Sequence, residues 1–340
     1  MRQMRNVLVT GAAGFIGSHF ATELLVKETT VNVYSYDKLT YAGCLSNLDS
    51  VQHNPRHHFI QGDINDRALV HATLRKYEID TIVHFAAESH VDNSIATPEI
   101  FFETNVMGTF NLLQAAKEYW LDEKTWSEKQ CRFHHISTDE VYGSLMPNEP
   151  SFTETTPYSP NSPYAASKAG SDHAVRAYGK TFALPVTISN CSNNYGPHQH
   201  AEKLIPTVIR CCLEGKSIPV YGDGRNCRDW LYVGDHCEAI YAILQRGAIG
   251  EMYNIGGGYE TDNLNLIKMI CQIIDEFYPQ NAPHMDLVQF VADRKGHDFR
   301  YAIDNTKIGR TLAWQPNTTI RKGLKDTVDF YISKHIKRAE

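Results

Sequence analysis

The chain has 340 residues, of which 42% are apolar and 21% are charged, and its formal net charge is −6. A chain of this length can bury a substantial core, in one large domain or in two unequal ones. The acidic balance and the lack of a long basic run argue against a nucleic-acid partner.

No apolar run approaches the roughly 18 residues that a membrane span needs, so we expect no membrane segment. The first apolar stretch, residues 7–9, is too short for a signal-peptide core and runs directly into glycines. The eight cysteines include no CxxC pair, which is typical of reduced thiols rather than of a disulfide framework. We therefore expect a cytoplasmic protein.

The first half of the chain alternates short apolar runs with segments of helical spacing, which predicts a parallel sheet with right-handed crossovers. The predicted strands are residues 7–9, 31–36, 58–60, 81–85, 132–136 and 186–189. The predicted helices are residues 15–27, 67–76, 100–119 and 164–181, with shorter ones later at 204–214 and 264–277.

Turn-rich segments predominate beyond about residue 190. The predicted fold class is therefore α/β: a Rossmann-type doubly wound parallel sheet with a smaller C-terminal substrate-binding lobe. We assign residues 1–190 to the first domain, to which segments near 228–260 return, and residues 191–340 mainly to the substrate domain. Ligands of such sheets bind at the carboxyl ends of the strands.

Three glycines, Gly11, Gly14 and Gly17, lie between the first predicted strand and the first predicted helix. Glycines at this spacing permit a tight turn and the close approach of a pyrophosphate, whose charge the helix N-terminus stabilises. Asp37 follows at the end of the second strand, where a carboxylate accepts from a ribose 2′-hydroxyl and repels a 2′-phosphate. The pattern predicts that residues 1–190 bind NAD in preference to NADP.

Tyr164 and Lys168 lie four residues apart in a predicted helix and therefore share one face. A tyrosine with an ordinary pKa of about 10 is a poor base at neutral pH, but a neighbouring ammonium lowers that pKa. The spacing alone is common on solvated helix faces. Behind a dinucleotide signature it indicates alcohol oxidation, with the lysine also holding the nicotinamide ribose.

Thr138, Asp139 and Glu140 directly follow the fifth predicted strand. Oxidation at one carbon needs only the tyrosine and a hydroxyl donor, so two carboxyl groups placed where a substrate lies indicate a further step. A carboxylate can remove a proton that a neighbouring ketone has acidified, and a hydroxyl leaving group needs a proton donor. The segment favours an enzyme that oxidises a sugar, eliminates water from it and returns the hydride.

Several histidines invite a metal interpretation, namely His198, His200 and the adjacent pairs at 57–58 and 134–135. Their spacings match no zincin motif, and no cysteine ligands accompany them. We expect histidines at strand ends or on the surface, and no metal.

Several stretches spread over nearly the whole chain are specific enough to indicate a family. They are VTGAAGFIGSH from Val9, DKLTYAG from Asp37, AAESHVDNS from Ala86, HHISTDEVYG from His134, SPYAASKAGSDH from Ser162, NCSNNYGP from Asn190, GDGRNCRDWLYV from Gly222 and DRKGHDFRYAID from Asp293. Together they resemble the nucleotide-sugar 4,6-dehydratases of the extended short-chain dehydrogenase/reductase superfamily.

The resemblance, which is strongest to the members that act on dTDP-glucose, implies a hydro-lyase with tightly bound NAD. It implies oxidation at C4, elimination of water across C5 and C6, and hydride return to C6, which gives dTDP-4-keto-6-deoxyglucose. In this scheme Tyr164, ionised with help from Lys168, removes the C4 hydroxyl proton while Thr138 orients the oxygen. Glu140 then removes the C5 proton, and Asp139 protonates the departing C6 hydroxyl.

The resemblance also assigns residues to the cofactor and to the sugar nucleotide. Those expected at NAD, besides Tyr164 and Lys168, are Gly11, Gly14, Phe15, Ile16, Gly17, Asp37, Lys38, Leu39, Thr40, Asp63, Ile64, Phe85, Ala86, Ala87, Ser89, Thr104 and Asn194. Those expected at the substrate are Ser89, Thr138, Asn193, Lys203, Leu204, Pro219, Val220, Tyr221, Arg228, Asn263, Asp293, Arg294, Lys295, Gly296 and His297. Physical reasoning independently selects Arg228 and Arg294 for the diphosphate, because a guanidinium matches phosphate oxygens.

The resemblance further implies a homodimer in which the helices around 100–119 and 164–181 pair across a twofold axis as a four-helix bundle. The chain departs from the family pattern at Asn93, where Arg is usual, at His198, where Tyr is usual, and at Lys295, where Pro is usual. Cys44 and Cys227 also lie in otherwise family-like stretches. None of these is a proposed catalytic residue, so they bear on base and sugar preference rather than on the reaction.

Other interpretations remain open at this point. A UDP-sugar 4,6-dehydratase would use the same residues, because thymine and uracil differ by one methyl group, worth about 1–3 kcal/mol. A nucleotide-sugar 4-epimerase would keep the glycines and the Tyr164–Lys168 pair but would not need Asp139 and Glu140. A decarboxylase would need a carboxylated sugar, and a non-catalytic NAD-sensing or scaffold protein would not need the intact set.

Overall fold

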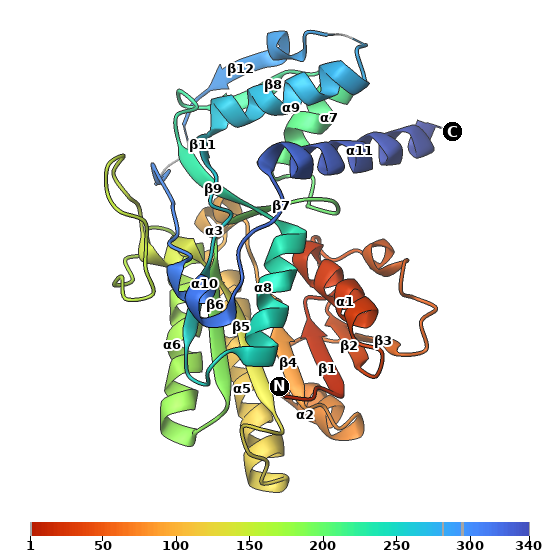
Figure 1. Cartoon of the computed structure of the whole chain (residues 1–340), viewed down its shortest axis with the longest axis vertical. Helices are drawn as coiled ribbons and strands as arrows, with labels where there is room; N and C mark the ends of the chain where they lie inside the picture. Colours follow the sequence, from red (N-terminus) through yellow and green to blue (C-terminus); the bar gives the residue numbers. More distant parts are fainter. Residues whose placement is uncertain (1, 281, 294–295, 340) are drawn as a thin grey trace.

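The computed structural model describes residues 2–280, 282–293 and 296–339, which form two lobes (Figure 1). The larger lobe contains a seven-stranded sheet in which every neighbouring pair of strands is parallel. The strands in spatial order are β10 (Met252–Ile255), β6 (Val186–Cys191), β5 (Arg132–Thr138), β4 (Thr81–His84), β1 (Asn6–Thr10), β2 (Asn32–Asp37) and β3 (His57–Gln61). The predicted doubly wound fold is confirmed, and the strand order reverses at β1, the place where such sheets bind ligands.

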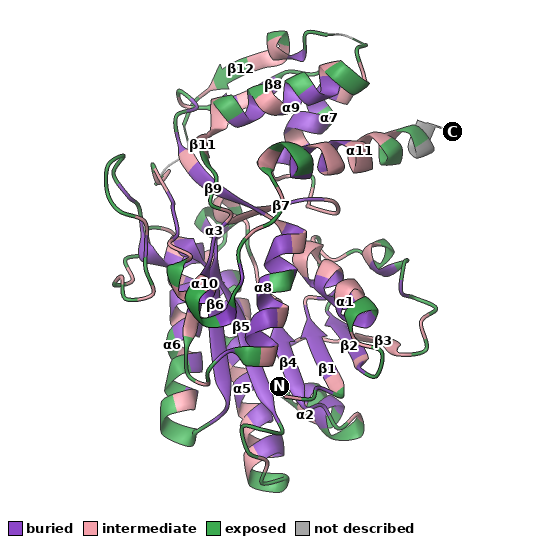
Figure 2. Cartoon of the chain, in the orientation of Figure 1, coloured by how far each residue is buried: buried purple, intermediate pink, exposed green. Residues whose placement is uncertain are grey.

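Helices cover both faces of the sheet, and most of its strands are buried (Figure 2). Side chains alternate between the two faces. On β1, Val7 and Val9 pack with α1 (Phe15–Lys27) and α8 (Val233–Arg246), whereas Leu8 packs on the opposite side. That opposite side is covered by α2 (Arg67–Lys76), α5 (Thr109–Ala116) and α6 (Pro163–Phe182). Because both faces are buried, β1 and β4 read as largely apolar runs, whereas the equally buried β5 contains polar residues such as His134 and His135.

The helix predicted at residues 100–119 is present as a long helical segment beside α6, but it does not have a regular α-helical repeat. After α3 (Val91–Ala96) come α4 (Pro98–Phe101), the π-helical η2 (Phe102–Gly108), α5, and the π-helical η3 (Lys117–Glu123). A π turn holds an extra residue and so changes which face the following side chains occupy. The sequence pattern located this helix without revealing its π turns.

The smaller lobe has its own core, formed largely by three helices (Figure 1). These are α7 (Leu204–Glu214), α9 (Asn263–Phe277) and α11 (Ile320–Ala339), and α11 was not predicted. Its strands form a three-stranded sheet of β11 (Glu260–Asp262), β9 (Cys227–Tyr232) and β7 (Asn193–Tyr195), and a pair of β12 (Val288–Val291) and β8 (Ile218–Tyr221). Between these segments the chain returns to the larger lobe as α8, β10 and α10 (Thr306–Leu312).

Across the described ranges, the helices include none with the length and apolar character of a membrane span. All eight cysteines are free thiols, and the Sγ atoms of Cys212 and Cys271 approach to 4.0 Å between α7 and α9.

Candidate active site

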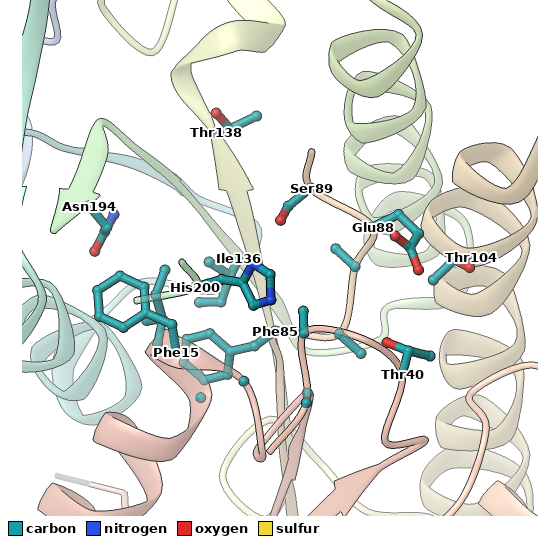
Figure 3. A pocket seen from close by; sticks show the side chains of 18 of the residues that line it. Phe15, Thr40, Phe85, Glu88, Ser89, Thr104, Ile136, Thr138, Asn194 and His200 are labelled. Atoms are coloured by element: carbon teal, nitrogen blue, oxygen red, sulfur yellow. The ribbon is translucent and has the colours of Figure 1, made fainter. Parts of the chain in front are cut away.

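A cavity of about 350 Å³ opens at the carboxyl ends of β1 to β6, and the start of the smaller lobe contributes to its wall (Figure 3). Residues from these six strand ends meet there because parallel strands end at the same edge of the sheet. The cavity therefore gathers segments that are far apart in the sequence, from Gly11 to Lys203.

The turn from β1 into α1 offers backbone N–H groups to this cavity. Gly11 has φ +68°, and a Cβ there would lie 2.7 Å from the backbone nitrogen of Ala86. Helix α1 begins after Gly14 with no side-chain cap and with no acidic residue in its first turn. Free N–H groups at a helix N-terminus attract anions, so this turn fits the diphosphate of a dinucleotide.

Asp37 lies at the end of β2 and is 8% exposed. Its two carboxylate oxygens accept hydrogen bonds from the backbone N–H groups of Ala13, at 2.9 Å, and Leu39, at 2.8 Å. Burial raises the pKa of Asp37, and these two hydrogen bonds act in the opposite direction. The carboxylate is thus fixed beside the glycine turn, where it can accept from a ribose hydroxyl.

The helix that carries Tyr164 and Lys168 has a strong start signal, because Ser162 accepts from the Ala165 N–H at 3.1 Å and Pro163 occupies the first turn. Both side chains line the cavity from one face of α6. Lys168 donates to the backbone carbonyl of Ile136 at 2.7 Å.

The expected lowering of the Tyr164 pKa is not what dominates in the structure. Burial raises the pKa of Tyr164 well above its usual value, Glu140 and Cys191 raise it further, and a hydrogen bond with Thr138 lowers it. Burial also lowers the pKa of Lys168. Desolvation is the largest influence on the pKa of Tyr164, and Lys168 is not among the main ones. Sequence spacing carries no information about desolvation.

The two carboxyl groups after β5 differ in their surroundings. Glu140 lines the cavity, whereas Asp139 is 2% exposed and does not line it. The hydroxyl of Thr138 donates to Asp139 Oδ1 at 3.3 Å and accepts from the Glu140 N–H at 3.3 Å. Residues 139–142 form a 3₁₀ turn, η4 (Asp139–Tyr142), whose successive side chains point in different directions. Asp139 thus lies behind Thr138, which does line the cavity, and the expectation that Asp139 acts on the substrate stays a prediction.

Burial raises the pKa of Asp139 well above its ordinary value. The nearby carboxylates of Glu140 and Asp229 act in the same direction, and Arg228 opposes them. A raised pKa favours the protonated form of a carboxyl group, which is the form that can serve as a proton donor.

Most residues that the sequence assigned to NAD line this cavity. Leu39, which has φ +60°, does not line it, and its backbone N–H donates to Asp37 instead. Those that do line it are Gly11, Gly14, Phe15, Ile16, Gly17, Asp37, Lys38, Thr40, Asp63, Ile64, Phe85, Ala86, Ala87, Ser89, Thr104, Tyr164, Lys168 and Asn194.

The residues assigned to the sugar nucleotide are divided between the cavity and the smaller lobe. Ser89, Thr138, Asn193 and Lys203 line the cavity. Arg294 and Lys295 lie outside the described residues. The remainder do not line the cavity and belong to the smaller lobe: Leu204, Pro219, Val220, Tyr221, Arg228, Asn263, Asp293, Gly296 and His297.

Arg228, selected for a diphosphate, is buried in β9. Its guanidinium donates to the carbonyl oxygens of Cys227, Asp298 and Phe299 and lies 4.3 Å from the ring centroid of Tyr301. These contacts fix the orientation of the side chain.

The cavity also contains residues that sequence reasoning did not select, including Glu88, Gln199, His200 and Glu202. His200 was interpreted as a surface or strand-end histidine, but its ring lies edge-on to that of Tyr41, with the centroids 5.5 Å apart. Its position just after the NNYGP stretch was the available signal. Histidines 134 and 135 are instead buried in β5, where each approaches hydroxyl groups.

Two of the departures from the family pattern lie near this cavity without replacing a catalytic residue. Asn93 forms a side-chain hydrogen bond with Tyr41. The Nδ1 atom of His198 lies 2.8 Å from Asn47 Oδ1, and the His198 ring packs against Phe330 with centroids 4.5 Å apart. The first contact joins α3 to the segment after β2, and the second joins the segment after β7 to a 3₁₀ turn at residues 45–48.

Comparisons with known proteins agree with this geometry. The family model described as GDP-mannose 4,6 dehydratase matches residues 8–327. A dTDP-glucose 4,6-dehydratase of Neisseria gonorrhoeae is 50% identical over 338 residues, which cover 98% of this chain and 97% of that protein. A protein of the same description from Haemophilus influenzae is 50% identical over 335 residues, covering 97% of this chain and 98% of that protein.

Solved structures show the same similarity. A dTDP-glucose 4,6-dehydratase of Streptomyces venezuelae with NAD and TYD bound is 47% identical, has a TM-score of 0.88, and is covered over 98% of both chains. A UDP-glucuronic acid 4-epimerase of Bacillus cereus is 29% identical with a TM-score of 0.84, covering 97% of this chain and 99% of that one. The fold alone thus does not separate dehydratase from epimerase, whereas sequence identity does. The chain belongs to the dTDP-glucose 4,6-dehydratase family, within the wider group of nucleotide-sugar dehydratases.

Proposed function

We propose that the chain is a dTDP-glucose 4,6-dehydratase, a hydro-lyase that converts dTDP-glucose into dTDP-4-keto-6-deoxyglucose and water. The observation that carries the proposal is the difference between Glu140, which lines the cavity, and Asp139, whose buried carboxyl group has a raised pKa. Elimination of water needs one base and one proton donor, and these two groups match the two roles.

The chain's own residues fit NAD as the resident cofactor. The open N-terminus of α1 and the turn at Gly11 would hold its diphosphate, Asp37 its adenosine ribose, and Lys168 its nicotinamide ribose. When bound, NAD supplies the acceptor for a hydride from C4 of the sugar and later the donor of a hydride to C6.

In the oxidation step, Tyr164 accepts the proton of the C4 hydroxyl and Thr138 hydrogen bonds to the oxygen. Burial keeps the phenol of Tyr164 neutral, so it must lose its proton before it acts as a base. Lys168 is the ammonium on the same helix face that favours this ionisation.

In the elimination step, Glu140 removes the C5 proton while Asp139 gives its proton to the C6 hydroxyl, which leaves as water. Glu140 returns its proton to C5 when C6 is reduced. Each turnover therefore leaves one extra proton on Tyr164 and one too few on Asp139. Thr138 hydrogen bonds with both side chains and lies between donor and acceptor for the proton that resets the site.

The test is mass spectrometry of the purified protein with dTDP-glucose and, in parallel, UDP-glucose, without added reductant. Loss of one water from dTDP-glucose is expected. Loss only from UDP-glucose would keep the mechanism and change the nucleotide, and an unchanged mass with both would refute the dehydratase. A product of unchanged mass that is inverted at C4, and that persists in Glu140→Gln, would identify a 4-epimerase.

The substrate half of the site follows from the same proposal. Lys203, Leu204, Pro219, Val220, Tyr221, Arg228, Asn263 and residues 293–297 would hold the thymidine diphosphate, with Ser89, Thr138 and Asn193 at the sugar. We retain the division into an NAD-binding domain of residues 1–190, joined by segments near 228–260, and a substrate domain of residues 191–340. The many free thiols support a cytoplasmic location.

The proposal includes a homodimer formed through the long helices. Ile100, Phe102 and Met107 are exposed on the segment that runs into α5, and Phe182 is exposed at the end of α6. The two helical segments pack against each other within the chain. Exposed apolar side chains on such a helix pair suit a symmetric four-helix bundle with a second copy. Light scattering should give twice the chain mass, and Met107→Glu should lower it, whereas a monomeric native protein would contradict the proposal.

A further inference from the structure

Helix α6 carries a third polar side chain on the face of Tyr164 and Lys168. Asp172 lies one turn beyond Lys168, and the three residues are 9%, 4% and 2% exposed in chain order. Positions i, i+4 and i+8 lie above one another on a helix. The helix face that carries the phenol of Tyr164 therefore also carries the buried ammonium of Lys168 and the buried carboxyl group of Asp172.

A buried ammonium is costly unless an opposite charge compensates for it. Lys168 donates to the Ile136 carbonyl at 2.7 Å, and its Nζ atom lies 3.5 Å from His135 Nε2. Neither partner is an anion, because burial holds the pKa of His135 well below its usual value and the imidazole is neutral. Asp172 is the largest influence that raises the pKa of Lys168.

The carboxylate of Asp172 is held by side chains from three other segments. Its Oδ2 accepts from the hydroxyls of Ser137 and Tyr158, each at 2.8 Å, and from Asn190 Nδ2 at 3.4 Å. Its Oδ1 lies 3.2 Å from His135 Nε2. Burial raises the pKa of Asp172, and Lys168 acts against burial together with the hydrogen bonds from Ser137, Tyr158 and Asn190. Hydrogen bonds to a carboxylate favour its ionised form and fix its orientation.

We propose that Asp172 is a positioning residue whose carboxylate keeps the Lys168 ammonium charged and in place, and so sets the pH range in which Tyr164 and Lys168 act. The proposal rests on the proposed function for its kinetic consequences, but not for the charge pairing itself. The Ser137, Tyr158 and Asn190 contacts serve in turn to hold the carboxylate.

The other titratable groups around Lys168 and Asp172 do not replace either of them as a charged group near neutral pH. His84 and His135 have pKa values lowered by burial, so neither is a competing cation near neutral pH. Burial raises the pKa values of Cys191, Tyr142, Tyr158 and Tyr164, so none of them is a competing anion. Asp139 and Glu140 raise the pKa of Tyr164, and neither is among the influences on the pKa of Lys168.

Asp172→Asn preserves the shape of the side chain and one oxygen acceptor but removes the charge. The pKa of Lys168 should then fall further, so its ammonium loses its proton at a lower pH. The alkaline limb of the kcat/KM profile should move down by at least about one pH unit, and activity should recover partly as the pH is lowered. At pH 8 we expect a loss of about tenfold or more.

Two matched variants remove a hydrogen bond to the same oxygen and leave the charge. Tyr158→Phe and Ser137→Ala should keep the alkaline limb where it lies in the native protein. A profile of Asp172→Asn that is lowered equally at every pH, or that matches the native one, would overturn the proposal.

A stability cycle tests the charge pairing without any activity. Asp172→Asn should lower the unfolding midpoint in the native background and lower it much less in the Lys168→Met background, where no ammonium needs a counter-charge. Equal losses in both backgrounds, or a double variant that does not fold, would refute the pairing. Native protein that leaves dTDP-glucose unchanged would refute the proposed function and leave this cycle interpretable.

Discussion

The cofactor half and the nucleotide half of the site are built in different ways. The cofactor half is assembled from consecutive strand ends of one sheet, so its residues converge wherever the sheet forms. The nucleotide half that we propose draws on α7, β8, β9, α9 and the segment after β12, which do not belong to one sheet. A sheet edge therefore makes a dinucleotide site directly, whereas the substrate site depends on how loops and a second lobe are arranged.

The largest effect should arise where the two halves meet. Tyr164→Phe removes the proton acceptor for the C4 hydroxyl, and we expect kcat to fall about 10³-fold while NAD remains bound. Steady-state kinetics with dTDP-glucose measures this. Tyr178→Phe, which removes a hydroxyl near the far end of the same helix, should leave kcat within about twofold. A loss below tenfold in Tyr164→Phe would argue against the phenol as the base.

A smaller loss should follow from breaking the cofactor half alone. Gly11→Ala places a Cβ 2.7 Å from the Ala86 backbone nitrogen at φ +68°. Strain of about 1–3 kcal/mol should weaken NAD binding roughly 5- to 150-fold, as titration calorimetry would show. Gly250→Ala has a similar positive φ with no atom within 4 Å, and it should leave NAD affinity unchanged. Equal affinities of the two variants would contradict the close-approach argument.

Breaking the nucleotide half should alter KM more than kcat. Arg228→Lys keeps the charge but loses the planar fork, so we expect KM for dTDP-glucose to rise about tenfold with kcat within about threefold. Arg225→Lys, at an exposed guanidinium in the preceding turn, is the matched control and should change neither constant. If kcat fell and KM stayed constant, Arg228 would act on the reacting sugar instead.

The smallest effect concerns stability and its dependence on pH. The pKa of Asp139 is raised in the folded state, so the folded protein keeps a proton that the unfolded chain releases above about pH 3.9. The contribution of this group to the free energy of unfolding therefore declines as the pH rises from about 3.9 toward the folded pKa. Asp139→Asn removes that decline. The midpoint of thermal unfolding should rise relative to the native protein by on the order of 2 °C, more at pH 8 than at pH 5. Asp49→Asn, at an exposed acid, should show no such trend; a constant difference at all pH values for Asp139→Asn would contradict the assignment.

The same contrast explains what could be predicted from the sequence. The glycine turn, Asp37 and the Tyr164–Lys168 spacing are local patterns, and the structure brings them to one cavity. The burial of Asp139 and the raised pKa of Tyr164 depend on what packs around them, so no spacing could reveal either.

Some of what was missed did leave a signal. Helix α11 buries Leu324 and Val328 against the smaller lobe, with Ile320, Tyr331 and Ile332 partly covered, which is an i, i+4 pattern. The residues assigned to the nucleotide came from resemblance and not from periodicity, because loops carry no repeat from which contacts follow. Their roles stay predictions.

The π-helical η2 has a consequence for insertions and deletions. Within it Thr104 lines the cavity and Asn105 hydrogen bonds to Ser167 and to the backbone of Glu88, while Phe102 and Met107 face outward. Deleting one residue from 102–108 would restore the regular repeat and turn the segment before it by about 100° relative to α5. Such a deletion would displace the residues of the cavity wall and those of the outer apolar surface together. Insertions and deletions should therefore be tolerated more readily in the surface loops of this chain than within residues 102–108.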